Sequence, residues 1–300
     1  MKKFIALSIF LLSFHTSVSA MELEIEDKNH ILQQKINTIV GSTAQQTYEK
    51  INTNWTYVAP NDEMSIDSKF WHATWIKGDG FLLGEKQQIN LPTVILKTTP
   101  ENIFEALEDL INKPASLECT IALTTAKIFC MKKILGDDWF KLYATHFYQL
   151  LDSTEGWSTD QFFHELPLQF IAQVEGKPKP GSLTYITNLS CYGKYKPNGN
   201  GRGSNVFCVG DNQYIGFSGM YSNGPQTLEV IEEQDLKLLC DTQDVERGHI
   251  AHTDICKSLI ESKGLFQHLR REEQVQDYNF HWIFLAQEFI DFMNTGNINL

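Results

Sequence analysis

The sequence lacks the motifs that mark common metal and nucleotide sites. Its six cysteines form no CxxC pair, so the pattern gives no support for a structural zinc site. No HExxH motif occurs, and the spacing of His249 and His252 favours a solvated helix start over a metal site. The glycine-rich run Pro197–Gly203 lacks the GKS/T of a phosphate-binding loop and leads into a predicted strand, not a helix. We therefore expect neither a metal nor a nucleotide cofactor.

Positive charge is also scarce, and long apolar runs are confined to the start of the chain. There are 25 Lys and Arg residues against 37 Asp and Glu, for a formal net charge of −12. So acidic a chain is poorly suited to nucleic-acid phosphates, and no nucleic-acid partner is expected. Met1–Ala20 has a charged start, a short apolar run and a small-residue end, which predicts a cleavable signal peptide. No later run reaches membrane length, so we expect a secreted or periplasmic protein without stable membrane insertion.

The stretch Ser116–Leu135 is apolar almost all round, which predicts a helix buried on every side. Ser116 is the predicted N-cap. Cys119 then falls in the first turn, near Glu118, where the helix dipole and unpaired backbone N–H groups favour a thiolate. The pattern therefore makes Cys119 a candidate nucleophile. The alternative is that Cys119 is a small buried hydrophobic residue, as free cysteines often are.

The other cysteines leave several pairings open. Cys119 and Cys130 lie eleven residues apart on one predicted helix, about 16 Å along its axis, which is too far for a disulfide. Two other pairings remain possible if the protein is exported. They are Cys191–Cys208 between neighbouring strands and Cys240–Cys256 between neighbouring helices.

The remaining pattern predicts an α+β fold. Helices are expected within Glu22–Lys50, from Pro100 with Thr99 as N-cap, and over Trp139–Leu151, Leu228–Leu239, Ile250–Glu261 and Val275–Met293, the last including His281. Short strands or loops are expected in Ile51–Pro60 and Phe70–Leu83, around a turn at Gly78-Asp79-Gly80. Strands are then expected at Leu183–Leu189, Asn205–Gly210 and Gln213–Ser218. Asp211-Asn212 is the predicted hairpin turn, and Gly136 is the predicted end of the Cys119 helix.

Six short pieces resemble, in the same order, the bacterial spore-coat-type transglutaminases, which are protein-glutamine gamma-glutamyltransferases. Leu117-Glu-Cys-Thr-Ile-Ala-Leu is similar to the Glu-Cys-Ala-Thr-Ala segment of that family. Arg202-Gly-Ser-Asn-Val is similar to its Arg-Gly-Glu-Asn-Val. The other pieces are Phe70-Trp71, Pro100–Asn112, Gly136-Asp-Asp-Trp-Phe and Val209-Gly-Asp-Asn-Gln-Tyr. Together they cover Phe70–Met220, about half of the chain.

The resemblance implies a papain-like core of the NlpC/P60 type, in which the helix bearing the cysteine packs on an antiparallel sheet. It divides the chain into a signal peptide (1–20), an N-terminal segment (21–69), a transglutaminase-like catalytic core (70–225) and a helical C-terminal extension (226–300). It also implies an acyltransferase without a cofactor that acts on protein glutamine and lysine side chains. Cross-linking and deamidation by water are both compatible with this chemistry.

Residue by residue, the resemblance places Cys119 at the nucleophile and Glu118 at its neighbouring acid. Ser204 stands where the family has a glutamate. Together with Arg202 and Asn205, it is a candidate for substrate binding or for the position of the replaced acid. A histidine usual in the next hairpin is missing around Phe217-Ser218. Two other functions therefore stay open. One is a cysteine peptidase or amidase of the same fold that uses a histidine from elsewhere. The other is a binding protein that has lost the chemistry.

Overall fold

A computed structural model describes residues 30–58, 62–82, 85–97, 100–138, 140–141, 144, 157–158, 171–174, 176–190, 192, 196, 201–240, 265–272 and 277–282. The predicted signal peptide Met1–Ala20, the predicted helix Ile250–Glu261 and most of the predicted helix Trp139–Leu151 lie outside these residues. Within them, no helix combines the length and the apolar character needed to cross a membrane.

The described chain is α+β, as the sequence predicted. Its helical elements are the N-terminal helix (residues 30–54), η1 (Pro100–Asn102), α2 (Ile103–Asn112), α3 (Cys119–Leu135), η3 (Gly219–Tyr221), α7 (Leu228–Cys240) and α9 (Leu265–Glu272). Two three-stranded sheets are built from β1 (Trp55–Tyr57), β5 (Ala115–Leu117) and β2 (Ser65–Ile66), and from β3 (Trp71–Leu82), β4 (Glu85–Leu96) and β6 (Trp157–Ser158). The largest sheet contains β7 (Ile171–Val174), β8 (Leu183–Thr187), β9 (Gly203–Gly210), β10 (Gln213–Gly216), β11 (Gln226–Thr227) and β12 (Tyr278–Trp282).

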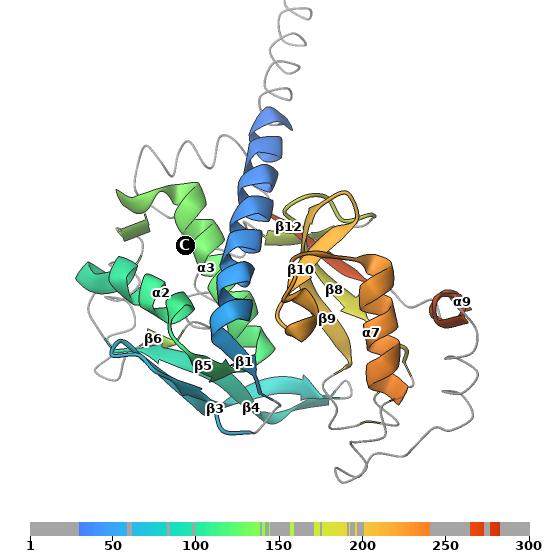
Figure 1. Ribbon diagram of the computed structural model, residues 1–300, viewed down its shortest axis with the longest axis horizontal. Coiled ribbons are helices and arrows are strands. Elements are labelled where there is room, and N and C mark those ends of the chain that lie inside the picture. The colour runs from blue at the N-terminus through green and yellow to red at the C-terminus, as the bar shows by residue number, and fades with distance from the viewer. Residues whose placement is uncertain are drawn as a thin grey trace, which may run out of the picture.

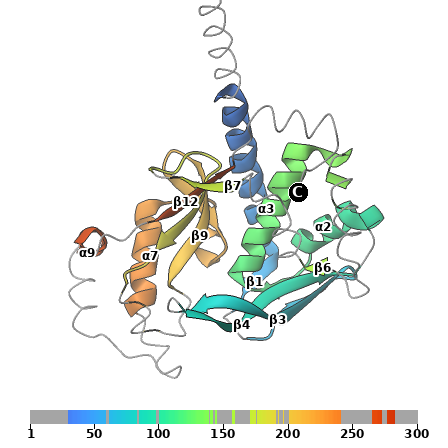
Figure 2. The same cartoon turned by 180° about the vertical axis from the view of Figure 1, so that it is seen from behind.

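The largest sheet is antiparallel and separates two groups of helices. Its strand order is β11-β10-β9-β8-β12-β7. Figures 1 and 2 show the N-terminal helix and α3 on one side of it and α7 on the other. The predicted β9–β10 hairpin is confirmed, because Asp211 and Asn212 form its turn with φ of 34° and 58°. Asn and Asp tolerate such positive φ values better than most residues.

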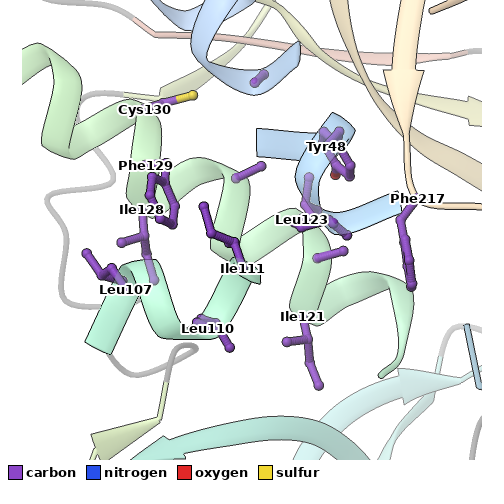
Figure 3. Packing of buried hydrophobic residues seen from close by; sticks show 14 of the residues in the cluster. Tyr48, Leu107, Leu110, Ile111, Ile121, Leu123, Ile128, Phe129, Cys130 and Phe217 are labelled. Carbon is purple, nitrogen blue, oxygen red and sulfur yellow. The ribbon is translucent and has the colours of Figure 1, made fainter. Parts of the chain in front are cut away.

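The predicted all-round burial of α3 is also confirmed. Side chains on every face of this helix are buried, from Ile121 in its first turn to Leu135 at its end. Figure 3 shows Leu107 and Leu110 of α2 towards one side of α3 and Tyr48 of the N-terminal helix towards the other. Gly136 ends the helix with φ of 77°, as predicted, and its N–H donates to the Lys132 carbonyl. The core therefore forms around α3, with the large sheet covering one flank.

The start of α3 differs from the prediction. Ser116 is not the N-cap, because residues 115–117 form β5, which pairs with β1 in parallel and with β2 in antiparallel fashion. Glu118 is the N-cap, and its side chain accepts a hydrogen bond from the Thr120 N–H. Alternate burial of Ala115 and Leu117 on either side of Ser116 gives the segment a strand pattern. The chain therefore passes directly from a strand into the buried helix.

Two other predicted segments are wrong. Gly78-Asp79-Gly80 does not form a turn, because it lies inside β3, where it pairs with residues 87–89 of β4. Residues 278–282 were expected within a helix but form β12, between β8 and β7, and this strand includes His281. Asn279 is 5 % exposed, with its oxygen accepting from Thr184 and its nitrogen donating to the Gly176 carbonyl. A buried Asn whose amide oxygen and nitrogen both have hydrogen-bond partners fits the central position of this strand.

One of the two disulfide pairings that the sequence left open is wrong. Cys119, Cys130 and Cys208 are free thiols, so a Cys191–Cys208 disulfide does not exist. Cys208 is 2 % exposed, inside β9, and faces the core as a small apolar side chain. Cys240, the last residue of α7, is disulfide-bonded to a cysteine outside the described residues. The proposed partner Cys256 lies in that part of the chain.

We predict that Gly203→Ala weakens the β8–β9 pairing. A Cβ at this position would lie 2.5 Å from the Ile186 carbonyl oxygen and 2.6 Å from Cζ of Tyr185, so the backbone would have to shift. Such overpacking costs about 1–3 kcal/mol, measurable as a lower urea midpoint. Gly219→Ala is the matched control, since a Cβ there meets nothing within 4 Å. Equal losses in the two variants would contradict this account.

Candidate active site

Cys119 and Glu118 form a pair at the N-terminus of α3. The Cys119 thiol donates to Oε1 of Glu118 at 2.9 Å. The other carboxylate oxygen, Oε2, accepts from the Thr120 N–H at 2.6 Å and from the Thr120 hydroxyl. Glu118 is 7 % exposed, and Cys119 is half-buried. The capping hydrogen bonds therefore fix the carboxylate that contacts the thiol.

This arrangement does not give the thiolate that the helix position predicted. Burial raises the pKa of Cys119 well above its usual value, and the Glu118 charge and hydrogen bond raise it further. The backbone N–H groups of Cys119 and Thr120 lower the pKa, but their effect is smaller. Because the N-cap residue is itself a carboxylate, its negative charge counteracts the effect of the helix dipole on the Cys119 pKa. Cys119 is therefore a protonated thiol at neutral pH, with a base in contact with it.

Tyrosines from two other elements lie around Cys119. Burial raises the pKa of Tyr48 in the N-terminal helix, and Cys119 raises it further. Burial also raises the pKa of Tyr185 in β8 to about 12, with smaller increases from Asp235 and from Cys119. The Tyr185 ring lies against the backbone of Gly203, at the start of β9. The start of α3 therefore faces the neighbouring ends of β8 and β9.

The predicted residues of the Arg202–Asn205 segment divide between the two faces of the sheet. Asn205 pairs with Tyr185 and shares a face with Phe207, whose ring centroid is 6.1 Å from that of Tyr48. Ser204 projects from the opposite face, where its hydroxyl donates to Oδ1 of Asp235 in α7 at 3.3 Å. Arg202 is exposed just before β9 and lowers the pKa of Tyr185. Of the three, Asn205 therefore lies on the side of the sheet that faces the N-terminal helix.

A buried acidic group on the α7 side was not found from the sequence. Asp235 is 1 % exposed, and burial raises its pKa to about 7. Its signal in the sequence is its spacing, because Asp235 stands four residues after Ile231 and four before Leu239, in the buried stripe of α7. A carboxylate in an apolar stripe is unusual enough to be noticed before a structure is known.

Within the described part of the chain, the only side chain that hydrogen-bonds the Cys119 thiol is that of Glu118. His72 is exposed on β3, and His268 pairs with Glu272 on α9. His164, His249 and His252 lie outside the described residues. No group of three His, Cys, Asp or Glu side chains within the described ranges is arranged to hold a metal ion.

We predict that Glu118→Gln makes Cys119 more reactive towards iodoacetamide. The substitution removes a charge and a hydrogen bond that both raise the thiol pKa, while a Gln oxygen can still accept from Thr120. Alkylation at pH 7 should accelerate about 10-fold for each unit by which the pKa falls. Mass spectrometry of the peptide containing Cys119 measures this rate. An unchanged or slower rate would contradict the electrostatic account.

Glu118 also caps α3, and comparing Glu118→Ala with Glu118→Gln separates this capping role from the role of its charge. Removing the side chain should destabilise the protein by about 1 kcal/mol, because the Thr120 N–H loses its acceptor. Glu118→Gln should retain most of this stability. Chemical denaturation of the two variants distinguishes the capping role of Glu118 from its charge.

Comparison of the chain with protein-family models, with curated proteins and with solved structures gave no match.

Proposed function

We propose that this protein is a cysteine acyltransferase of the transglutaminase type, which acts after export on glutamine side chains of proteins. The observation that carries the proposal is the contact between the Cys119 thiol and the Glu118 carboxylate at the start of a buried helix. The antiparallel sheet beside that helix supports a papain-like arrangement of the NlpC/P60 type. The choice of glutamine as substrate rests on the sequence resemblance, and the export on the segment Met1–Ala20.

Glu118 is suited to act as the general base and acid of this reaction, because its Oε1 lies 2.9 Å from the sulfur. In the first half, the thiol proton passes to Glu118 as the sulfur attacks the glutamine amide carbon. The C–N bond then breaks, and Glu118 returns the proton to the leaving nitrogen, which departs as ammonia. A glutamyl thioester on Cys119 remains.

The second half reverses the roles. A lysine amine attacks the thioester carbon and gives a proton to Glu118. The C–S bond breaks, the isopeptide bond forms, and Glu118 returns the proton to the sulfur. Attack by water instead gives a glutamate. The backbone N–H of Cys119, which lowers the thiol pKa, stabilises the negative charge that develops on the sulfur.

One observation favours a second candidate, a binding protein that has lost the chemistry. A thiol whose pKa is raised by burial is a poor nucleophile unless a base takes its proton during attack. If Glu118 acts only as a helix cap, Cys119 is an inert core residue. The two functions therefore differ in whether Glu118 exchanges a proton with the sulfur. A peptidase or amidase would additionally need a histidine beside the thiol, for which His164, His249, His252 and His281 are the candidates.

The proposal predicts incorporation of a primary-amine probe, such as dansylcadaverine, into a glutamine-rich protein such as casein, with release of ammonia. Cys119→Ala should abolish both signals because no thioester forms. Glu118→Gln should lower them roughly 10²–10⁴-fold, since general acid–base catalysis is lost, even though its thiol is more often ionised. Cys130→Ala is the matched control for loss of a buried thiol and should keep the activity.

Absence of amine incorporation and ammonia release by the wild type, under conditions where a known transglutaminase is active, would contradict the acyltransferase function. Cleavage of the casein chain without ammonia release would instead indicate a peptidase. Activity that survives in Cys119→Ala would exclude Cys119 as the nucleophile.

A further inference from the structure

The α7 side of the large sheet contains a cluster of buried ionisable groups that the proposed reaction does not use. Arg270 of α9 pairs with Glu232 of α7 and, at 2.5 Å, with Asp277 just before β12. Asp277 also accepts from the Thr187 N–H at the end of β8. Asp235 completes the cluster through its bond to Ser204 of β9. The cluster therefore connects α7 and α9 to the ends of three strands.

The charges of this cluster do not balance. Glu232, Asp277 and Asp235 are three carboxyl groups, and Arg270 is the one cation paired with members of the cluster in the described structure. The guanidinium is already shared between Glu232 and Asp277. Asp235 is left with one hydrogen bond, from Ser204, and its Oδ2 is buried without a partner. Burying a carboxylate with an unpaired oxygen costs much more free energy than burying the neutral, protonated carboxyl group.

Side chains from the neighbouring elements influence the pKa of Asp235. Glu232 and Asp277 oppose ionisation, whereas Ser204 and Arg270 favour it. Asp235 in turn raises the pKa of Tyr185 in β8 and of Tyr221 in η3, whose phenols stay neutral, and the Tyr221 hydroxyl is also buried without a hydrogen-bond partner. Burial has the largest effect of all, and the balance keeps the pKa of Asp235 near 7. The carboxyl therefore changes charge at physiological pH.

We propose that Asp235 is a pH-sensitive latch, which holds α7 and α9 most firmly on the sheet at acidic pH and loosens them as the pH rises towards neutrality. Opening of this layer exposes Asp235 to water, where its pKa returns to the usual carboxyl range of about 4. Opening therefore releases a proton at every pH between about 4 and 7. By linkage, the equilibrium constant for opening then rises about 10-fold for each pH unit in this window and levels off above it.

Hydrogen exchange of the backbone amides tests the latch in the whole protein. After correction for intrinsic exchange, protection of α7 should fall about 50-fold between pH 5 and pH 7 and only about 2-fold further between pH 7 and pH 9. Amides of α2, on the other side of the molecule, are the internal reference and should keep their protection. Asp235→Asn should remove the pH dependence from α7, because an amide does not ionise.

Glu233→Gln is the matched control. Glu233 lies on the same helix but is exposed and pairs with Lys237, so this variant should keep the wild-type pH dependence. The latch would be overturned if α7 of the wild type shows no decline in protection, or if Asp235→Asn retains the decline. If Asp235→Asn fails to fold, carbon-13 NMR of aspartate carboxyls in the wild type decides the question. An aspartate that titrates near pH 7 supports the latch, and titration of all aspartates below pH 5.5 overturns it.

Discussion

The all-round burial of α3 is the constraint on which the rest of the structure depends. A helix with no solvent-facing side must be covered by several partners, here α2, the N-terminal helix and the large sheet. The same packing buries the Glu118 carboxylate and half of Cys119 at the start of the helix. Burial therefore sets both the architecture of the core and the protonation of its cysteine, and the position of the helix end alone does not determine the reactivity.

The sequence predicted the features that depend on local chemistry. The end of α3 at Gly136 and the hairpin turn at Asp211-Asn212 need specific backbone angles that few residues adopt, so their signals are read directly from the chain. The buried character of α3 follows from its composition. The start of that helix was misplaced by two residues, because Ser116 and Glu118 can both cap a helix and only the pairing of β5 decides between them.

What the sequence could not predict depends on residues distant in the chain. β12 is recognisable only from its partners β7 and β8, which lie about 100 residues earlier. At the candidate site, Cys119 and Glu118 were found from the sequence, but the raised thiol pKa was not. The prediction considered the effect of the helix terminus on the thiol pKa, but not the opposite effects of burial and of the charged N-cap residue Glu118. The place of Asp235 in the buried stripe of α7 could have been seen in the sequence, but its unpaired carboxyl oxygen could not.

The position of β12 also constrains the order in which the chain can fold during synthesis. β8 and β7 leave the ribosome about 100 residues before the strand that lies between them. Until β12 emerges, each presents an edge of unpaired N–H and C=O groups, a template for pairing with other chains. The largest sheet can therefore be completed only after β12 has been synthesised, and until then its open edges favour aggregation over folding.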